Sequence, residues 1–380
     1  EQALDRAEKA ERARNATAIE ATVKDLAKLP PVHMVYAGTV YRGTGNFRGT
    51  GGQPRPIHLL ARGQVTTPKE EMQPGALKVL EGMVPPHFAL ATDAPEGERR
   101  AALAKWIVDP ANPLAWRSIV NRIWQHHFGR GIVETPDDFG RMGALPSHPE
   151  LLDWLAVKFR DDMGGSLKAL HKLIVMSAAY RQSSSISNEK AAELDSGNTL
   201  LWRANARKLE AEAVRDAVLA VSGKLDLTAG GPGWQDFVVQ HPEHSPHYRY
   251  DLADPDDPKT WRRSIYRFIV RSQMQPFMTS LDCADPSMRV PKRNESVSPA
   301  QALALLNNGF IVTQAAHFAE RVQAEAGPDL GAQIIRAHRL ALGRSPSPEE
   351  KDQLVSFARK NGLQNACRVL LNLNEFAFVD

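Results

Sequence analysis

Cysteine is scarce in this chain of 380 residues, which contains only Cys283 and Cys367. They lie far apart and in no metal-binding spacing, so they form either one disulfide or two buried thiols. The sequence also has no Cys-x-x-Cys-His motif, and this chain therefore cannot hold a covalently attached c-type haem. We accordingly expect no haem cofactor in the chain itself.

Long apolar runs and an excess of one charge are also missing. Without a run of about 18 apolar residues, we predict no membrane-spanning segment. The 47 basic and 44 acidic residues are interspersed and leave a net charge of +3. A nucleic-acid-binding protein more often concentrates positive charge on one face, so we expect no nucleic-acid partner. The 42% hydrophobic and 24% charged content is that of an ordinary globular protein with at least one full core.

The N-terminal part of the chain predicts a helix followed by a ribbon. Residues 3–28 are rich in the helix formers Ala, Glu, Lys and Arg, and a proline pair at 30–31 ends them. Because the chain begins without Met or a signal-peptide core, we expect residues 1–30 to be a helical linker from a missing upstream region. Two strand candidates, VHMVYAGTVY and RPIHLLARGQV, then flank a Gly-rich loop. Residues 31–97 therefore predict a small β-ribbon and an extended segment rich in Pro and Gly.

Residues 98–380 have helical periodicity, and the predicted fold class is therefore mainly α. We expect a multi-helix body, orthogonal or bundle-like, with long irregular loops that include an insertion at about 228–259. The apolar pattern of residues 261–272 predicts one of the helices. Cap signals mark the start of three others: Asn112-Pro113, Ser147 with Glu150, and Ser347 with Glu350.

One polar segment after the first of these helix starts gathers side chains that acid–base chemistry needs. His126 or His148 could shuttle protons, with Asp137 or Asp138 as partner. Arg122 and Arg130 could hold an anionic group beside them. The alternative is structural, in which arginines of this segment pair with nearby acids and pin the loops to the helices.

A histidine-rich loop has the pattern closest to a metal site. His241, His244 and His247 are spaced three apart and are followed by Asp251 and Asp254. Imidazole nitrogens in such a loop can converge on Zn²⁺ or another divalent cation, with carboxylates completing the shell. The spacing matches no known zinc motif, and exposed histidine loops also bind metal adventitiously. A divalent metal is the one cofactor that we expect from the residues.

Signals for covalent catalysis are poor. No Gly-x-Ser-x-Gly motif occurs, and Cys283 in LDCADP has no activating histidine beside it, so it packs as a small apolar group. Most tryptophans have the helical spacing of core residues. Trp234, in GGPGW, is borne on a loop and is therefore a candidate ligand-contact residue.

Several blocks of this sequence occur in an order known from one bacterial family. They are WIVDPANPLAWRSIVNRIWQHHFGRGIVETPDDFG, SHPELLDWLA, LEAEAVRDAVLAVSG, RRSIYRFIVRS, RNESVSPAQALALLNN and LALGRSPSPEE. With them the chain resembles the planctomycete-specific domain one family, a domain of unknown function (1553). The family's recurrent polar positions carry no established role, and the resemblance makes them candidate ligand-binding residues here: Asn121, Arg122, Arg130, Glu150 and Arg293.

The resemblance also implies a cellular context. Members of that family are typically large exported bacterial proteins that often carry a cytochrome c-like segment and a second domain of unknown function upstream. Those two domains are therefore the expected partners within the full-length protein. The expected location is the periplasm or the cell envelope.

Two functions follow as hypotheses. The first is an accessory or binding module that contacts an envelope protein or an anionic polysaccharide, and it rests on pinned loops and on the lack of an intact catalytic motif. The second is a hydrolase or metal-assisted enzyme that acts on carbohydrate through His126, Asp138 and His148. A concave pocket shared by these three side chains would favour the enzyme.

Overall fold

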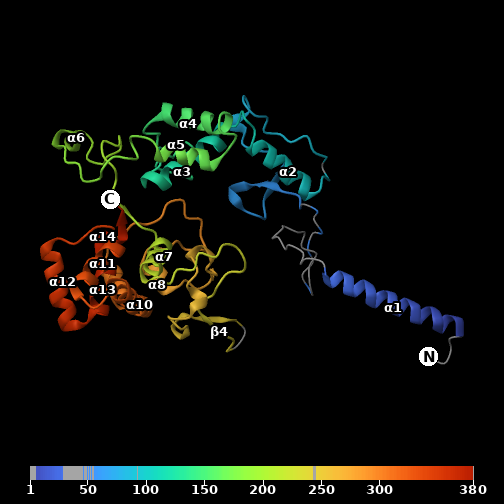
Figure 1. Cartoon of the computed structure of the whole chain (residues 1–380). Helices are drawn as coiled ribbons and strands as arrows, with labels where there is room; N and C mark the ends of the chain where they lie inside the picture. Colours follow the sequence, from blue (N-terminus) through green and yellow to red (C-terminus); the bar gives the residue numbers. More distant parts are fainter. Residues whose placement is uncertain are drawn as a thin grey trace. The chain divides into compact units, whose positions relative to one another are not determined.

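The computed structural model describes residues 6–28, 46, 49, 51, 53, 55–91, 93–242 and 245–379 (Figure 1). Contacts divide the chain into two units, Glu1–Asp109 and Pro110–Asp380. Within the described residues there are fourteen α-helices and three antiparallel pairs of short strands. The predicted mainly α fold class is therefore confirmed. In the same residues, no helix combines the length and the apolar character that crossing a membrane requires.

The first unit contains α1 (Arg6–Lys28), the strands β1 (His58–Leu60) and β2 (Pro68–Glu71), and α2 (Glu96–Ile107). α1 occupies most of the helix predicted at residues 3–28. β1 lies inside the predicted strand RPIHLLARGQV, but it pairs with β2, with His58 opposite Glu71. The other predicted strand, residues 32–41, lies outside the described residues, and so does most of the Gly-rich loop.

Three helices build the first core of the second unit: α3 (Pro113–Phe128), α4 (Pro149–Asp161) and α5 (Leu167–Val175). Their buried side chains form one cluster that includes Val120, Phe159 and Leu170. α3 begins where it was predicted to begin. The Asn112 side chain accepts a hydrogen bond from the Leu114 amide, and Pro113 occupies the first turn.

The capping box predicted at α4 is wrong. His148 is the residue that precedes the helix, and Pro149 opens it. Proline fits the first helical position because no amide hydrogen is needed there. The Ser147 hydroxyl instead donates to the carbonyl of Ile132 at 3.3 Å, and Glu150 is exposed in the first turn.

A second, larger core draws its buried side chains from residues between Ala211 and Phe376, and Figure 1 shows helices that carry them. Its helices are α7 (Ala211–Ser222), α8 (Pro276–Ser280), α9 (Pro299–Asn307), α10 (Gly309–Ala326), α11 (Leu330–Leu342), α12 (Pro348–Asn361) and α13 (Leu363–Leu371). α10 packs against α7, α11 and α13, and Phe318 on α10 is fully buried. The capping box predicted at Ser347 and Glu350 is confirmed at the start of α12. Cys283 and Cys367 are free thiols, and burial raises the pKa of Cys367 to about 12.

The remaining elements are short: α6 (Glu189–Leu194), α14 (Asn374–Ala377), and the strand pairs β3 (Arg207–Lys208) with β6 (Phe378–Val379) and β4 (Val238–Gln240) with β5 (His247–Arg249). The helix predicted at residues 261–272 is wrong. That segment holds a short 3-10 turn at Ser264–Tyr266 and runs extended elsewhere, where Arg262 bridges to Asp226 and Arg267 to Trp234. Backbone pairing with a distant segment therefore outweighs the local helical pattern.

A buried ammonium group joins several of these elements. Lys208 on β3 is 7% exposed at its side chain, and its Nζ donates three hydrogen bonds. The acceptors are Asp282 Oδ2 at 2.7 Å, the Ser296 carbonyl at 2.8 Å and Gln301 Oε1 at 2.9 Å. All three ammonium hydrogens thus have partners, as a buried cation requires. Asp282 has a left-handed φ of 66°, which the surrounding bonds hold in place.

We predict that Lys208→Met destabilises the protein by about 3–5 kcal/mol, because it breaks an ion pair whose side chains are 7% and 16% exposed and leaves the half-buried Asp282 without its cation. Urea unfolding of both proteins measures the difference. Lys158→Met is the matched control, since Lys158 pairs with Asp162 at the surface and such pairs contribute about 0–1 kcal/mol. Equal losses from the two substitutions would contradict the buried network.

Candidate functional site

A cavity of about 520 Å³ opens where the end of α3 meets β3 and the start of α7. We call it the His126 cavity. Its polar lining includes His126, Tyr180, Gln182, Asn205 and Glu210. Its apolar lining includes Phe128, Leu209 and Val379. A hollow with apolar walls and a few convergent polar groups is the usual form of a ligand site.

Arg207 fixes the wall of this cavity. The last carbonyls of a helix have no helical partner, and α3 ends at Gly129, whose φ is 78°. The Arg207 guanidinium donates to two of these carbonyls, those of His126 and His127. A cation at this end also interacts favourably with the helix dipole. The guanidinium therefore ties β3 to α3 and orients the residues at the end of α3.

A pair of histidines lies beside the cavity. His127 Nε2 and His171 Nδ1 are 2.7 Å apart. One of the two nitrogens donates a hydrogen bond, and the nitrogen that accepts it carries no proton, so its ring is neutral. The Tyr180 ring meets His127 edge to face, with the centroids 5.4 Å apart. Burial, and then the neighbouring His171, Arg207 and His126, lower the pKa of His127 from its ordinary value of 6.5. The pair is therefore arranged to stay uncharged on at least one ring at neutral pH.

A second cavity, of about 240 Å³, adjoins the first. It is lined by Arg130, Glu134, Ser147 and His148, and Asn205 lines both cavities. Arg130 pairs with Glu134 at 2.6 Å and donates to Thr199 Oγ1 at 3.2 Å. This agrees with the structural alternative for Arg130, in which an arginine pins its own loop. We call this hollow the His148 cavity.

The three catalytic candidates do not share one cavity. His126 lines the larger hollow and His148 the smaller one. The carboxylate of Asp138 accepts a hydrogen bond from the Gly140 amide at 2.8 Å and so stabilises its own turn. The condition that we set for the enzyme hypothesis is therefore not met by these three residues.

Asn121 has a structural position rather than a ligand-facing one. It is fully buried, its Nδ2 donates to the Val133 carbonyl at 2.9 Å, and its Oδ1 accepts from the Val133 amide at 2.7 Å. Any side chain at Gly131 would collide with this clamp, since a Cβ there would lie 2.5 Å from the Val133 oxygen. Arg122 and Glu150 are exposed, and Arg293 lines a third pocket together with Glu212.

Trp234, predicted as a loop-borne contact residue, is buried, and its contact with a ligand stays a prediction. Only 6% of it is exposed, and its Nε1 donates to the Arg263 carbonyl at 3.2 Å. Its ring centroid lies 4.3 Å from the guanidinium of Arg215. Burial lowers the pKa of Arg215 to about 10. The sequence placed Trp234 in a loop correctly, but the loop folds over a buried cation.

The histidine-rich loop is only partly described. His241 follows β4 and His247 begins β5, and both are exposed, whereas His244 lies outside the described residues. Among the residues that are described, no group of three or more His, Cys, Asp or Glu is placed to hold a metal ion. A divalent metal at this loop stays a prediction.

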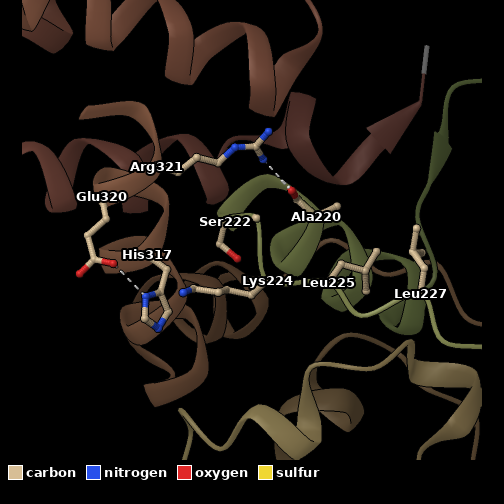
Figure 2. Close-up of a pocket in the computed structure, with 9 residues that line it drawn as sticks. Ala220, Ser222, Lys224, Leu225, Leu227, His317, Glu320 and Arg321 are labelled. Atoms are coloured by element: carbon tan, nitrogen blue, oxygen red, sulfur yellow. Dashed lines mark hydrogen bonds and ion pairs between the residues drawn. The ribbon is translucent and has the colours of Figure 1, made fainter. Parts of the chain in front are cut away.

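A larger hollow of about 620 Å³ lies between the end of α7 and α10, and Figure 2 shows its lining. Two of its charged groups already have hydrogen-bond or ion-pair partners. Arg321 donates to the carbonyls of Ala220 and Val221 at 2.8 and 2.9 Å. His317 is 3.2 Å from Glu320 and 2.7 Å from Asp256. These contacts join α7 and the segment around Asp256 to α10, so we assign this hollow a structural role.

Sequence reasoning missed most polar groups of the His126 cavity, among them Tyr180, Gln182 and Glu210. The block SAAYRQ that holds the first two, and the block LEAEAVRDAV that follows Lys208, were both visible. Neither block contains a catalytic motif. The polar residues of the cavity come together only in the folded chain, where Arg207 on β3 bonds to the end of α3. The polar groups of the cavity therefore come from three segments far apart in the chain.

Comparison with known proteins gives one match. Residues 99–358 match the family model PSD1, described as a protein of unknown function (DUF1553). No curated protein and no solved structure matches the chain.

We predict that His127 makes the stability of the protein depend on pH. Its folded pKa is lowered, so the unfolded chain takes up the proton first as the pH falls below about 6.5. The contribution of His127 to stability is therefore present above that pH and is lost as the pH falls through the folded pKa. Between about pH 7 and pH 5, the free energy of unfolding measured in urea should fall less for His127→Phe than for the original protein. Identical losses would contradict the lowered pKa.

Proposed function

This chain belongs to the PSD1 family of proteins of unknown function (DUF1553), and we propose that it is an accessory module that binds polysaccharide in the bacterial envelope. The observation that carries the proposal is the lining of the His126 cavity. Imidazole, phenol, amide and carboxylate groups stand there beside apolar side chains. Sugar rings have hydroxyls on their edges and C–H groups on their faces, and this lining offers partners for both.

The groups that face the cavity are suited to hydroxyl recognition. Tyr180 is 41% exposed and His126 is exposed at the end of α3. The Gln182 Nε2 donates a hydrogen bond to the Leu201 carbonyl, which fixes the orientation of the side-chain amide. The Oε1 of Gln182 is left as an acceptor for a ligand hydroxyl. Such groups give orientation and specificity, whereas the apolar wall excludes water.

The two adjoining cavities support a polymeric ligand over a single sugar. Asn205 belongs to both linings. Its side chain is held by Asn198 and by the Phe128 carbonyl, so the shared wall is fixed. Neighbouring sugar units could occupy the two hollows, with His148 and Arg130 at the smaller one.

Charge supports an acidic polysaccharide. The Arg207 guanidinium is bonded to carbonyls rather than to a carboxylate, and the exposed His126 lies beside it. Glu210 is the acid of the lining, so we expect the acidic sugar to lie on the Arg207 side. The proposed setting is an exported, planctomycete-type protein with cytochrome c-like and other domains upstream, and the sequence blocks quoted above support it.

The competing function, hydrolysis of carbohydrate, has less support. It needs an acid and a base on either side of one bond. His126 and His148 line different hollows, and Asp138 is bonded within its own turn. Binding uses the same cavities without that requirement.

We predict that an oligogalacturonate, an acidic oligosaccharide, binds the full chain in calorimetric titration. Tyr180→Ala and His126→Ala should each weaken binding by about tenfold, because each removes a contact of about 1.4 kcal/mol. His241→Ala is the matched control, since His241 is exposed outside both cavities, and it should bind as the original protein does. A cello-oligosaccharide of equal length should bind more weakly.

Absence of binding to both oligosaccharides would refute the proposal. So would binding that Tyr180→Ala and His126→Ala leave unchanged. Release of reducing ends during the titration would instead favour the hydrolase.

A further inference from the structure

A separate cavity, of about 430 Å³, opens at the start of α10. We call it the Arg215 cavity, after the charged side chain of α7 that lines it. Its volume is within the range of about 300–1,000 Å³ that small-molecule sites usually have. Its apolar lining includes Pro276, Phe277 and Phe310, and the centroids of the two phenyl rings are 5.8 Å apart. The cavity therefore has the size and the apolar surface to hold a small organic ligand.

Arg215 is a buried cation whose hydrogen bonds all go to neutral oxygens. The residue is 5% exposed. Its guanidinium donates to the carbonyls of Thr260 and Arg262 and to the Ser264 hydroxyl. Hydrogen bonds between a guanidinium and a carboxylate are stronger than such neutral ones. A carboxylate brought by a ligand would therefore find an unused partner here.

The protein supplies less negative charge to this cation than it needs. Asp216 lies 3.9 Å from Arg215 and 3.6 Å from Arg263, so two guanidinium groups share one carboxylate. The Nε of Arg215 makes no hydrogen bond with the described residues. It is also not among the buried atoms that lack a partner, so it is not sealed from solvent. An anionic group in the cavity could bond to this nitrogen and balance the charge.

The start of α10 favours an anion at the same place. Asn308, Gly309 and Phe310 line the cavity where this helix begins. The first amides of a helix have no helical acceptor, and the helix dipole attracts negative charge there. The Asn308 side chain accepts from the Phe310 amide at 3.0 Å, which leaves the Gly309 amide for a ligand. The buried guanidinium and the helix start thus both point to a carboxylate.

The acidic groups of the lining point to a positive charge on the same ligand. Asp251 accepts two hydrogen bonds from Arg249, at 2.8 and 2.6 Å, and Asp236 lies 3.8 Å from Arg267. Asp254 is exposed and accepts a backbone amide at 2.9 Å, but it has no cationic partner among the residues that the structure describes. The lining therefore offers one carboxylate without a counter-charge, and an ammonium group would supply it.

We propose that the Arg215 cavity binds an α-amino acid with an apolar side chain. The carboxylate of the amino acid bonds to Arg215 and to the start of α10, and its ammonium group lies at Asp254. Its side chain packs against Phe277 and Phe310. One unmatched charge of each sign selects this zwitterion over a simple acid or a simple amine. The site is separate from the His126 and His148 cavities and does not depend on sugar binding.

Three ligands of similar shape test the proposal in ligand-observed NMR titrations of the full chain. L-Phenylalanine carries both charges, phenethylamine lacks the carboxylate, and 3-phenylpropanoate lacks the ammonium group. L-Phenylalanine should bind at least about tenfold more tightly than either analogue, because each analogue loses one charge-assisted contact. The comparison with phenethylamine tests the carboxylate contact without a substitution of Arg215, which also holds the segment around Thr260.

Asp254→Asn tests the other end of the ligand. It should weaken L-phenylalanine by about tenfold and should not weaken 3-phenylpropanoate, which has no ammonium group. Asp226→Asn is the matched control, because Asp226 also accepts the amide two residues later, at 2.8 Å, and lies outside the cavity. It should leave both affinities unchanged.

The proposal is overturned if L-phenylalanine does not bind, if either analogue binds as tightly, or if the two asparagine variants behave alike. Absence of oligosaccharide binding alone would count against the sugar site and not against the Arg215 cavity.

Discussion

The buried ammonium of Lys208 is the interaction on which the functional surfaces depend. Its three hydrogen bonds connect β3 with Asp282, Ser296 and Gln301. Arg207, the preceding residue, holds the end of α3 and so shapes the His126 cavity. Cys283, the residue after Asp282, lines the third pocket together with Glu212 and Arg293. One desolvated cation therefore fixes a two-residue strand near both hollows, and the loss of one partner of this cation would be strongly destabilising.

The same arrangement decides which charges remain for ligands. Lys208, Arg130 and Arg293 all have acidic partners within the protein. Imidazole, hydroxyl and amide groups face the His126 cavity, together with the Glu210 carboxylate and the Arg207 charge on backbone carbonyls. Such a surface can recognise a polar ligand, whereas the acid–base residues predicted from the sequence, His126, Asp138 and His148, do not converge on one cavity. This contrast favours binding over hydrolysis.

Some features set by neighbouring residues could be predicted from the sequence, although the capping box predicted at Ser147 and Glu150 was wrong. The starts of α3 and α12 depend on Asn112 and on Ser347 with Glu350, and both were found. Contacts between distant segments could not be predicted. Residues 261–272 looked helical, but Arg262 and Arg267 bridge to Asp226 and Trp234, and such tertiary pairing overrides local propensity. Trp234 and the Lys208–Asp282 pair were missed for the same reason, since burial is decided by the packed whole.

Histidine side-chain NMR on the full chain tests the central claim most directly. With the acidic oligosaccharide added, the imidazole signals of His126 and His127 should shift, because both residues line the cavity. The signal of His317, which lies in the hollow between α7 and α10, should stay in place. Shifts confined to His317 or to the histidines of the 241–247 loop would contradict the account, as would no shift at all.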